Sequence, residues 1–336
     1  MNEGDQVRFA GVFRGGGLQA AAGPETTPHA AQDGAWTGRR PSWKFRPCII
    51  QWKNGKRGEI LKLRKQLKHN VYGLLNRPGL RSILAVLATL IATVRVRKLC
   101  KVSYEGEWVQ RFPSCTLVEP RLTLRTPKEI EKYISTYFLY KYFPSPGDTI
   151  VDVGAGAGWE TLFFSRHVGA SGRVISIEAH PVTFRCLSKM CQKNGLENVT
   201  LIQAAAGNQE GEVQISDTEH TANTIITVGS GIQVPCTTLD KIFRSNGLSR
   251  VDFLTMNIEG AERLALSGMR EMVQKTMNVC IGCHDFLADE GGPEEMRTKA
   301  DVIRFLTEND FAVFVGESDF LDNYVYGLNK KLRTNP

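Results

Sequence analysis

The residues with the clearest chemical purpose follow Asp152, where glycines stand at positions 154, 156 and 158. A short apolar run precedes them and a helical pattern follows, which predicts a buried strand, a tight turn and the start of a helix. Glycine has no Cβ, so φ can become positive and a ligand can approach the main chain. The first turn of the helix offers unpaired N–H groups to that ligand. We therefore expect a ligand-binding turn rather than a plain connection between a strand and a helix.

The spacing of the glycines separates two kinds of ligand. A dinucleotide-binding turn has the pattern Gly-x-Gly-x-x-Gly, whose third glycine allows close packing around a pyrophosphate. Here Gly158 comes one residue early and Trp159 occupies the dinucleotide position, which disfavours a nicotinamide-dependent oxidoreductase. The pattern Asp-x-Gly-x-Gly-x-Gly instead resembles motif I of the Rossmann-like methyltransferases that bind S-adenosylmethionine.

Glu178 closes the segment Arg-Val-Ile-Ser-Ile-Glu, which predicts the next strand. In open α/β sheets, ligands lie outside the carboxyl ends of the strands. A carboxylate at that place can accept hydrogen bonds from both hydroxyls of a ribose. The simpler alternative is a solvated acid at the end of a strand.

Two further stretches narrow the resemblance to one family. Residues 173–211 contain Ile-Glu-Ala-His-Pro and Lys-Asn-Gly-Leu-Glu-Asn-Val, and residues 234–262 contain Val-Pro-Cys-Thr-Thr-Leu-Asp and Asn-Ile-Glu-Gly-Ala-Glu. Together with the glycine motif they resemble the FkbM-type methyltransferases, and the resemblance covers about residues 146–286.

The resemblance implies a methyltransferase that uses S-adenosylmethionine to methylate a hydroxyl group on a small molecule, a sugar or a lipid-linked acceptor. The third strand end, Gln203-Ala204-Ala205-Ala206, supplies no acid for the adenine amino group, so Gln203, Asn208 or main-chain groups must serve. The residues expected at the cofactor are Asp152, Gly154, Gly156, Gly158, Glu178, Ala179, Gln203 and Ala204.

The chain departs from the family where the fourth core strand ends. The family usually has Lys-Ile-Asp-Val-Glu-Gly there, and this chain has Thr-Met-Asn-Ile-Glu-Gly at 255–260. Asn257 can orient a hydroxyl or amino group, but it cannot take a proton. The alternative is therefore a weakened enzyme, acting as a nucleoside-binding or membrane-tethered interaction module of the same fold.

Oxygen methylation gains from a base at the acceptor. Glu259, His284 and Asp285 follow predicted strands, so we expect them beside the acceptor, with Asn257 orienting it. The proposed catalytic residues are Glu259, His284 and Asn257, and His220 in a polar loop is a weaker candidate. For any single histidine a structural role is at least as common.

Cys280, Cys283 and His284 formally match a c-type haem attachment motif. They fall within a predicted buried strand, so we reject haem. No second Cys/His pair stands at zinc-ligand spacing, and we expect no metal. Cys186 and Cys191 share one predicted helix and are assigned to its core face.

The charge of the chain is unevenly distributed. The net charge is +7, but residues 39–101 carry +16, residues 1–38 carry −2 and residues 102–336 carry −7. The basic character therefore belongs to an extension, and we expect no specific nucleic-acid partner. Peripheral contact with an anionic membrane through residues 41–101 remains an alternative. The expected partner is a small-molecule acceptor with a hydroxyl group.

Three regions follow from composition and pattern. Residues 1–40 are predicted to be a disordered tail, residues 41–101 a basic extension with a helix at 58–75 and a short apolar segment, and residues 102–336 the methyltransferase domain. The apolar segment 82–94 is shorter than the roughly 20 residues of a bilayer span. No secretory leader is visible and the eight cysteines are scattered, so we expect a cytoplasmic protein, with membrane association as the alternative.

Strands and helices alternate from residue 149 onward, which predicts an α/β fold. We expect a Rossmann-like methyltransferase fold, whose mostly parallel seven-stranded sheet has helices on both faces and an antiparallel edge strand. Upstream, a capped helix is expected from Thr126 to about Phe143, after strands at 107–112 and 114–118.

Overall fold

The structure is a computed structural model that describes residues 72–73, 76–217, 231–289, 291–316, 318 and 321–334. All of them belong to one unit, residues 57–336. The tail predicted at 1–40 and nearly all of the helix predicted at 58–75 lie outside the described residues.

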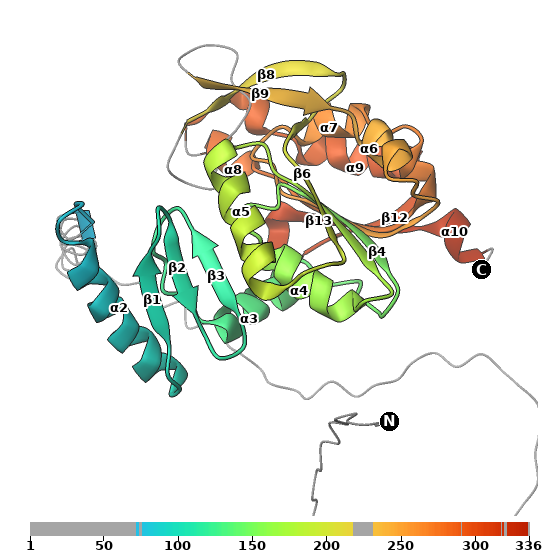
Figure 1. Ribbon diagram of the computed structural model, residues 1–336. Helices are drawn as coiled ribbons and strands as arrows, with labels where there is room; N and C mark the ends of the chain where they lie inside the picture. Colours follow the sequence, from blue (N-terminus) through green and yellow to red (C-terminus); the bar gives the residue numbers. More distant parts are fainter. Residues whose placement is uncertain are drawn as a thin grey trace, which may run out of the picture. The chain divides into compact units, whose positions relative to one another are not determined.

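A seven-stranded sheet forms the centre of this unit (Figure 1). Its strand order is β12-β13-β11-β10-β4-β5-β6. Five neighbouring strands run parallel, from β11 to β6. The predicted mostly parallel sheet is therefore confirmed. The strands are β4 (Thr149–Val153), β5 (Arg173–Ile177), β6 (Val199–Ile202), β10 (Val251–Met256), β11 (Thr276–Gly282), β12 (Phe311–Val315) and β13 (Tyr324–Asn329).

One edge of the sheet is the pair β12–β13, which is antiparallel, as the sequence predicts. The strand that runs against the others is β13, because it pairs antiparallel with both β11 and β12. It lies one place in from the edge, and β12 is the edge strand. The helix α9 (Lys299–Glu308) precedes β12, and the next strand, β13, lies between β12 and β11.

Helices cover both faces of the sheet because successive strand residues point to opposite sides. Ile150 and Val174 face one apolar core, which α4 and α5 complete. Val151 and Ile175 face the other core, which α6, α7 and α9 complete. The helices are α4 (Trp159–Val168), α5 (Pro181–Asn194), α6 (Leu239–Ser245) and α7 (Glu262–Ser267).

An N-terminal group of elements packs on the first of these cores. It comprises the helix α2 (Arg81–Val96), the antiparallel sheet β1 (Lys101–Tyr104), β2 (Trp108–Arg111) and β3 (Thr116–Glu119), and the helix α3 (Pro127–Tyr137). The buried carboxylate of Glu107 joins this group to α5 by ion pairs with Arg185 and Lys189. The predicted capping box of Thr126 and Glu129 starts α3, which ends at Tyr137 rather than near Phe143.

A second small sheet has the order β7-β9-β8, formed by β7 (Ala205–Ala206), β8 (Gly211–Ser216) and β9 (Gly231–Thr237). The strand predicted at 199–205 is therefore two strands in two sheets. The strand predicted at 279–286 ends at Gly282, and the chain then enters helix α8 (Asp285–Asp289). The remaining elements are η1 (Met272–Lys275), η2 (Glu294–Met296), η3 (Leu321–Asn323) and α10 (Lys330–Thr334).

Candidate active site

The glycine turn lies at the carboxyl end of β4, as the sequence predicts. Gly154, Gly156 and Gly158 have φ values of 81°, 55° and 93°, in the left-handed region that glycine enters at little cost. A Cβ on Gly158 would lie 2.3 Å from Met190 Cε, so this glycine allows α5 to approach the turn. A Cβ on Gly154 would lie 2.2 Å from the main-chain oxygen of Asn257. Two of the three glycines are therefore required by packing as well as by the turn.

Glu178 is held rigidly beside this turn. Its Oε2 accepts a hydrogen bond from Gly156 N at 2.9 Å, and its Oε1 accepts one from His180 N at 2.8 Å. The residue is only 8% exposed, and burial raises the pKa of its carboxyl to about 7. Each oxygen keeps a second lone pair that can accept a hydroxyl. The structure thus fixes an acceptor of hydrogen bonds where the sequence predicts the ribose contact.

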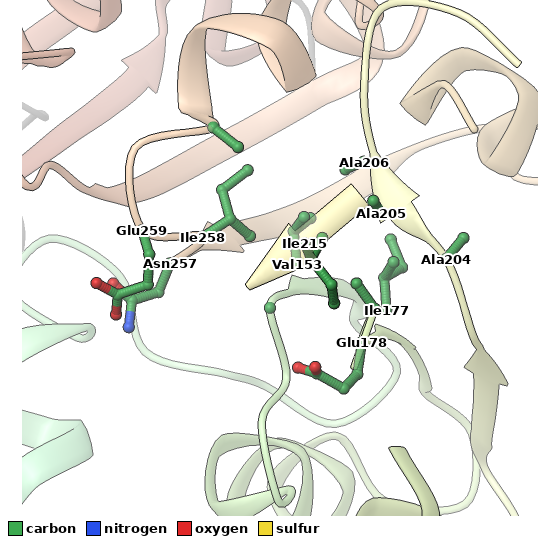
Figure 2. Close-up of a pocket in the computed structure, with 13 residues that line it drawn as sticks. Val153, Ile177, Glu178, Ala204, Ala205, Ala206, Ile215, Asn257, Ile258 and Glu259 are labelled. Carbon is green, nitrogen blue, oxygen red and sulfur yellow. The ribbon is translucent and has the colours of Figure 1, made fainter. Parts of the chain in front are cut away.

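A small cavity opens between the ends of the central strands (Figure 2). Its volume is about 50 Å³. Figure 2 shows Asn257 and Glu259 on one side, Ala204 and Ala205 on the opposite side, and Glu178 between them. Ala179 also lines it, together with Val153, Gly154, Ile177, Ala206, Ile215, Ile258 and Ala261. The small side chains leave room for a flat apolar group at the strand ends.

A larger cavity, of about 450 Å³, lies on the other side of the glycine turn. Gly154, Asn257 and Glu259 line both cavities, so the two adjoin at these residues. The wall of the larger cavity comes from the N-terminal elements and the start of α4. It comprises Tyr72, Glu119, Pro120, Arg121, Leu122, Thr123, Tyr133, Phe138, Asp152, Ala155, Gly156, Ala157, Trp159 and Glu160.

Carboxyl groups gather at this larger cavity. Burial raises the pKa of Glu119 and of Glu160 to about 7. Burial, together with the nearby charge of Glu160, also raises the pKa of Asp152. Asp152 Oδ2 accepts a hydrogen bond from Thr161 Oγ1 at 2.9 Å. Buried acids of this kind favour a positively charged ligand, because a cation stabilises their ionised form.

Glu259, His284 and Glu262 form a chain of hydrogen bonds at the rim. His284 Nε2 lies 3.2 Å from Glu259 Oε2, and His284 Nδ1 lies 3.0 Å from Glu262 Oε1. Glu262 is fully buried, and its other oxygen accepts a hydrogen bond from Thr298 Oγ1. Glu259 has a positive φ of 51°, a conformation that costs a non-glycine residue of order 1–3 kcal/mol. The surrounding contacts therefore hold Glu259 in a strained position that directs it to both cavities.

The contacts of His284 suit a positioning role. Burial alone would lower the pKa of its imidazole, but hydrogen bonds and charges from Glu259 and Glu262 outweigh burial and raise the pKa to about 10. Each ring nitrogen lies within 3.2 Å of a carboxylate oxygen, so both are engaged by acids. The catalytic role that the sequence predicts for His284 stays a prediction.

Most of the predicted site residues come together, but two do not. Gln203 is exposed and does not line either cavity, because β6 ends at Ile202 and the chain then leaves the sheet. Asp285, the first residue of α8, accepts hydrogen bonds from the main-chain N–H groups of Thr298 and Lys299 at the start of α9, and it lines neither cavity. His220 lies outside the described residues.

The sequence reasoning missed Glu262 and Glu119. Glu262 stands three residues after Glu259, within the motif Asn-Ile-Glu-Gly-Ala-Glu, and that spacing was an available signal. Glu119 is far from the motifs in sequence, and only the fold brings it to the larger cavity.

Comparison with known families decides the class of the domain. The sequence profile of the methyltransferase FkbM domain matches residues 152–313. Residues 152–313 are an FkbM methyltransferase domain. The matched range includes the glycine turn, Glu178 and the Glu259–His284–Glu262 chain. Among curated protein sequences, none matches this chain significantly.

Solved structures that are similar to this chain include methyltransferases of distant sequence. An FkbM methyltransferase from Methylobacillus flagellatus is 18% identical with a TM-score of 0.42, over 60% of this chain and 50% of that one. The present chain thus spans about half the length of that protein. A SAM-dependent methyltransferase from Aquifex aeolicus is 20% identical (TM-score 0.36, 61% and 97% covered). Aeropyrum pernix fibrillarin, crystallised with natively bound S-adenosyl-L-methionine, is 14% identical (TM-score 0.38, 68% and 88% covered). Similarities of this size do not define a function.

The cofactor of the FkbM domain is S-adenosylmethionine, and the residues at its site suit that molecule. S-adenosylmethionine carries a sulfonium and an ammonium group, both cationic, and a ribose diol. Asp152 and Glu160 supply buried carboxyl groups to a cation. Glu178 offers two acceptor oxygens to a diol, and the alanines at 204–206 offer an apolar surface to an adenine.

Proposed function

We propose that this FkbM domain methylates a hydroxyl oxygen of a small-molecule acceptor, which binds in the larger cavity. The observation that carries the proposal is the position of Glu259. Its carboxylate lines both cavities and is held there by a buried imidazolium. A carboxylate at the junction of a cofactor site and a second cavity is suited to accept the proton of a reacting hydroxyl.

The proposed roles divide between the two cavities. Glu178, Ala179 and Ala204 hold the nucleoside, and Asp152 with Glu160 faces the cationic end of the cofactor. S-adenosylmethionine supplies an electrophilic methyl group. Asn257 orients the acceptor, and Glu259 takes its proton as the bond from the acceptor oxygen to the methyl carbon forms and the methyl–sulfur bond breaks, which leaves S-adenosylhomocysteine. Enclosure of the reacting groups excludes water and aligns donor with acceptor.

The wall of the larger cavity points to an acceptor with both an apolar ring and polar groups. Tyr133, Phe138 and Trp159 supply flat apolar surfaces, and Glu119 with Thr123 supplies polar atoms. The guanidinium of Arg125 lies 5.1 Å from the centre of the Trp159 ring. This combination suits a hydroxylated cyclic molecule, such as a sugar or a natural product that bears hydroxyl groups.

The test is methyl transfer to a panel of hydroxylated acceptors, comparing the wild type with Glu259→Gln. The substitution preserves size and removes the base, so kcat should fall by about 10²- to 10⁴-fold. Affinity for S-adenosylhomocysteine, measured by calorimetry, should stay within about threefold. Glu294→Gln is the matched control, because Glu294 is an exposed carboxylate in η2. This control should retain full activity.

Two results would contradict the proposal. If Glu259→Gln turns over as fast as the wild type, the base lies elsewhere. If the wild type binds S-adenosylhomocysteine but methylates no hydroxyl in the panel while methylating amines, the acceptor atom is nitrogen.

A further inference from the structure

Most of the large aliphatic side chains of the helix α2 lie on the outside. Its buried residues are Ala88 and Ala92, Leu84 and Val96 are partly buried, and Thr89 Oγ1 accepts a hydrogen bond from Val102 N at 2.9 Å. The helix lies beside β1 in Figure 1. A helix on a protein surface normally turns its large apolar side chains inward. In α2, six of the eight large aliphatic side chains are exposed instead.

The outer face of α2, with the residue Leu99 just beyond it, forms a continuous apolar surface. Its members are between 44% and 85% exposed, and no other element among the described residues exposes more than two large hydrophobic side chains. An apolar surface of this kind marks an interaction site. We call it the α2 surface, and it consists of Ile83, Val86, Leu87, Leu90, Ile91, Val94 and Leu99.

Cations border the α2 surface at both ends. Arg77 precedes the helix, and Arg97, Lys98 and Lys101 follow it, all of them exposed. No aspartate or glutamate occurs from residue 77 to residue 104, and the sequence from 39 to 76 carries a further net charge of +10. Aliphatic side chains with cations at both ends of the helix match an anionic lipid surface, which offers acyl chains below acidic headgroups.

The same charges argue against other occupants. A second copy of the α2 surface would bring like charges together, and residues 39–71 carry the same positive sign. A nucleic acid would satisfy the cations but leave the aliphatic side chains without an apolar partner. Among the described residues, no helix has the length and hydrophobicity needed to cross a bilayer. With 16 residues, α2 is about 24 Å long, less than the roughly 30 Å of a hydrocarbon core.

We infer that the α2 surface docks the protein on an anionic membrane, with the helix lying in the plane of the interface and its aliphatic side chains below the headgroups. The inference stands on α2 alone and does not depend on the acceptor proposed above. It assigns α2 the role of a peripheral anchor.

The test is co-sedimentation of the full chain with phosphatidylcholine vesicles that contain or lack phosphatidylserine. Wild-type protein should bind the anionic vesicles more tightly, and added salt should weaken the binding. The double variant Val86→Gln, Leu90→Gln should bind at least about tenfold more weakly, because two side chains no longer enter the apolar layer. Arg97→Gln with Lys98→Gln should lose the preference for anionic lipid in part.

Leu264→Gln is the matched control, because Leu264 is a 39% exposed aliphatic residue on α7, outside the α2 surface. It should bind vesicles as the wild type does. Calorimetry with S-adenosylhomocysteine and thermal unfolding should be unchanged in all three variants, which shows that a loss of vesicle binding is not a loss of fold.

The inference is overturned if the wild type ignores both kinds of vesicle, or if the Val86/Leu90 variant binds them as tightly as the wild type. It is also overturned if that variant instead converts a dimer to a monomer in light scattering without a change in vesicle binding. If the wild type binds RNA but no vesicle, the membrane inference is overturned and the partner is a nucleic acid.

Discussion

Glu259 is paired with a buried histidine. His284 lies between two carboxylates, and these ion pairs raise its pKa from 6.5 to about 10 despite burial. Neutral imidazole is the common form of a histidine base. A raised pKa favours the charged ring, so we propose that His284 positions Glu259.

This arrangement makes the stability of the protein depend on pH in a defined direction. A raised pKa in the folded state contributes stability that is fully present below the unfolded value of 6.5 and is lost as pH rises through about 10. We therefore expect the wild type to be more stable than His284→Gln near neutral pH, and this difference to shrink toward about pH 10. Urea unfolding of both proteins across that range measures it. A difference that is constant with pH would show that His284 is neutral.

The acids at the cavities make cofactor binding depend on pH. Burial raises the pKa of Glu160 to about 7 and also raises the pKa of Asp152. A bound sulfonium favours their ionised form, so binding should release protons. The affinity for S-adenosylmethionine should therefore rise between about pH 6 and about pH 8. The affinity for the product S-adenosylhomocysteine, which has no sulfonium charge, should rise less over the same range.

Calorimetry in two buffers of different ionisation enthalpy checks this proton release. For S-adenosylmethionine the apparent binding enthalpy should differ between the buffers near pH 7. If the two ligands show the same pH dependence, these carboxyls do not face the sulfonium.

At the scale of elements, the glycine turn joins β4, α4 and α5. A Cβ at Gly158 would lie 2.3 Å from Met190 Cε and 2.6 Å from Leu187 Cδ1, and φ there is +93°. Gly158→Ala should therefore destabilise the fold by roughly 1–3 kcal/mol, since both the contact and the backbone are unfavourable. Urea unfolding checks this value. The matched control is Gly106→Ala on the loop between β1 and β2, where φ is also positive but a Cβ would meet nothing within 4 Å. If both variants lose the same free energy of unfolding, backbone strain alone explains the loss and the contact with α5 contributes nothing.

The parts of the site that depend on the alternation of strand, turn and helix could be predicted from the sequence. Asp152 lies near the end of β4, the glycines form the turn after it, and Glu178 follows β5. Their positions at the carboxyl ends of the strands were therefore predictable. Gln203 and Asp285 lie away from both cavities because the strands before them end earlier than the apolar pattern does. An apolar pattern predicts the existence of a strand more reliably than it predicts the residue at which the strand ends.

The larger cavity could not be predicted, because distant parts of the chain form it. Glu119 and Tyr133 come from the N-terminal elements, while Trp159 comes from α4. No periodicity relates these positions, and the resemblance that the sequence shows begins after them. The partnership of Glu262 with His284 likewise depends on how α7 approaches the end of β11.

At the scale of the whole described unit, the N-terminal elements form part of the wall of the larger cavity. Glu107 holds Arg185 and Lys189 of α5, and the side chain of Asn194 exchanges hydrogen bonds with the main chain of Thr116. These contacts place β3 and the residues after it over the glycine turn. Eight of the 17 residues that line the larger cavity, the proposed acceptor site, therefore lie outside the matched residues 152–313.

The measurement that tests the central claim most directly is a crystal structure with S-adenosylhomocysteine. We expect the ribose hydroxyls on Glu178, the adenine against Ala204 and Ala205 in the small cavity, and the homocysteine end beyond Gly154 beside Glu160. A nucleoside bound away from the glycine turn, or crystals that take up none at saturating concentration, would contradict the assignment of both cavities.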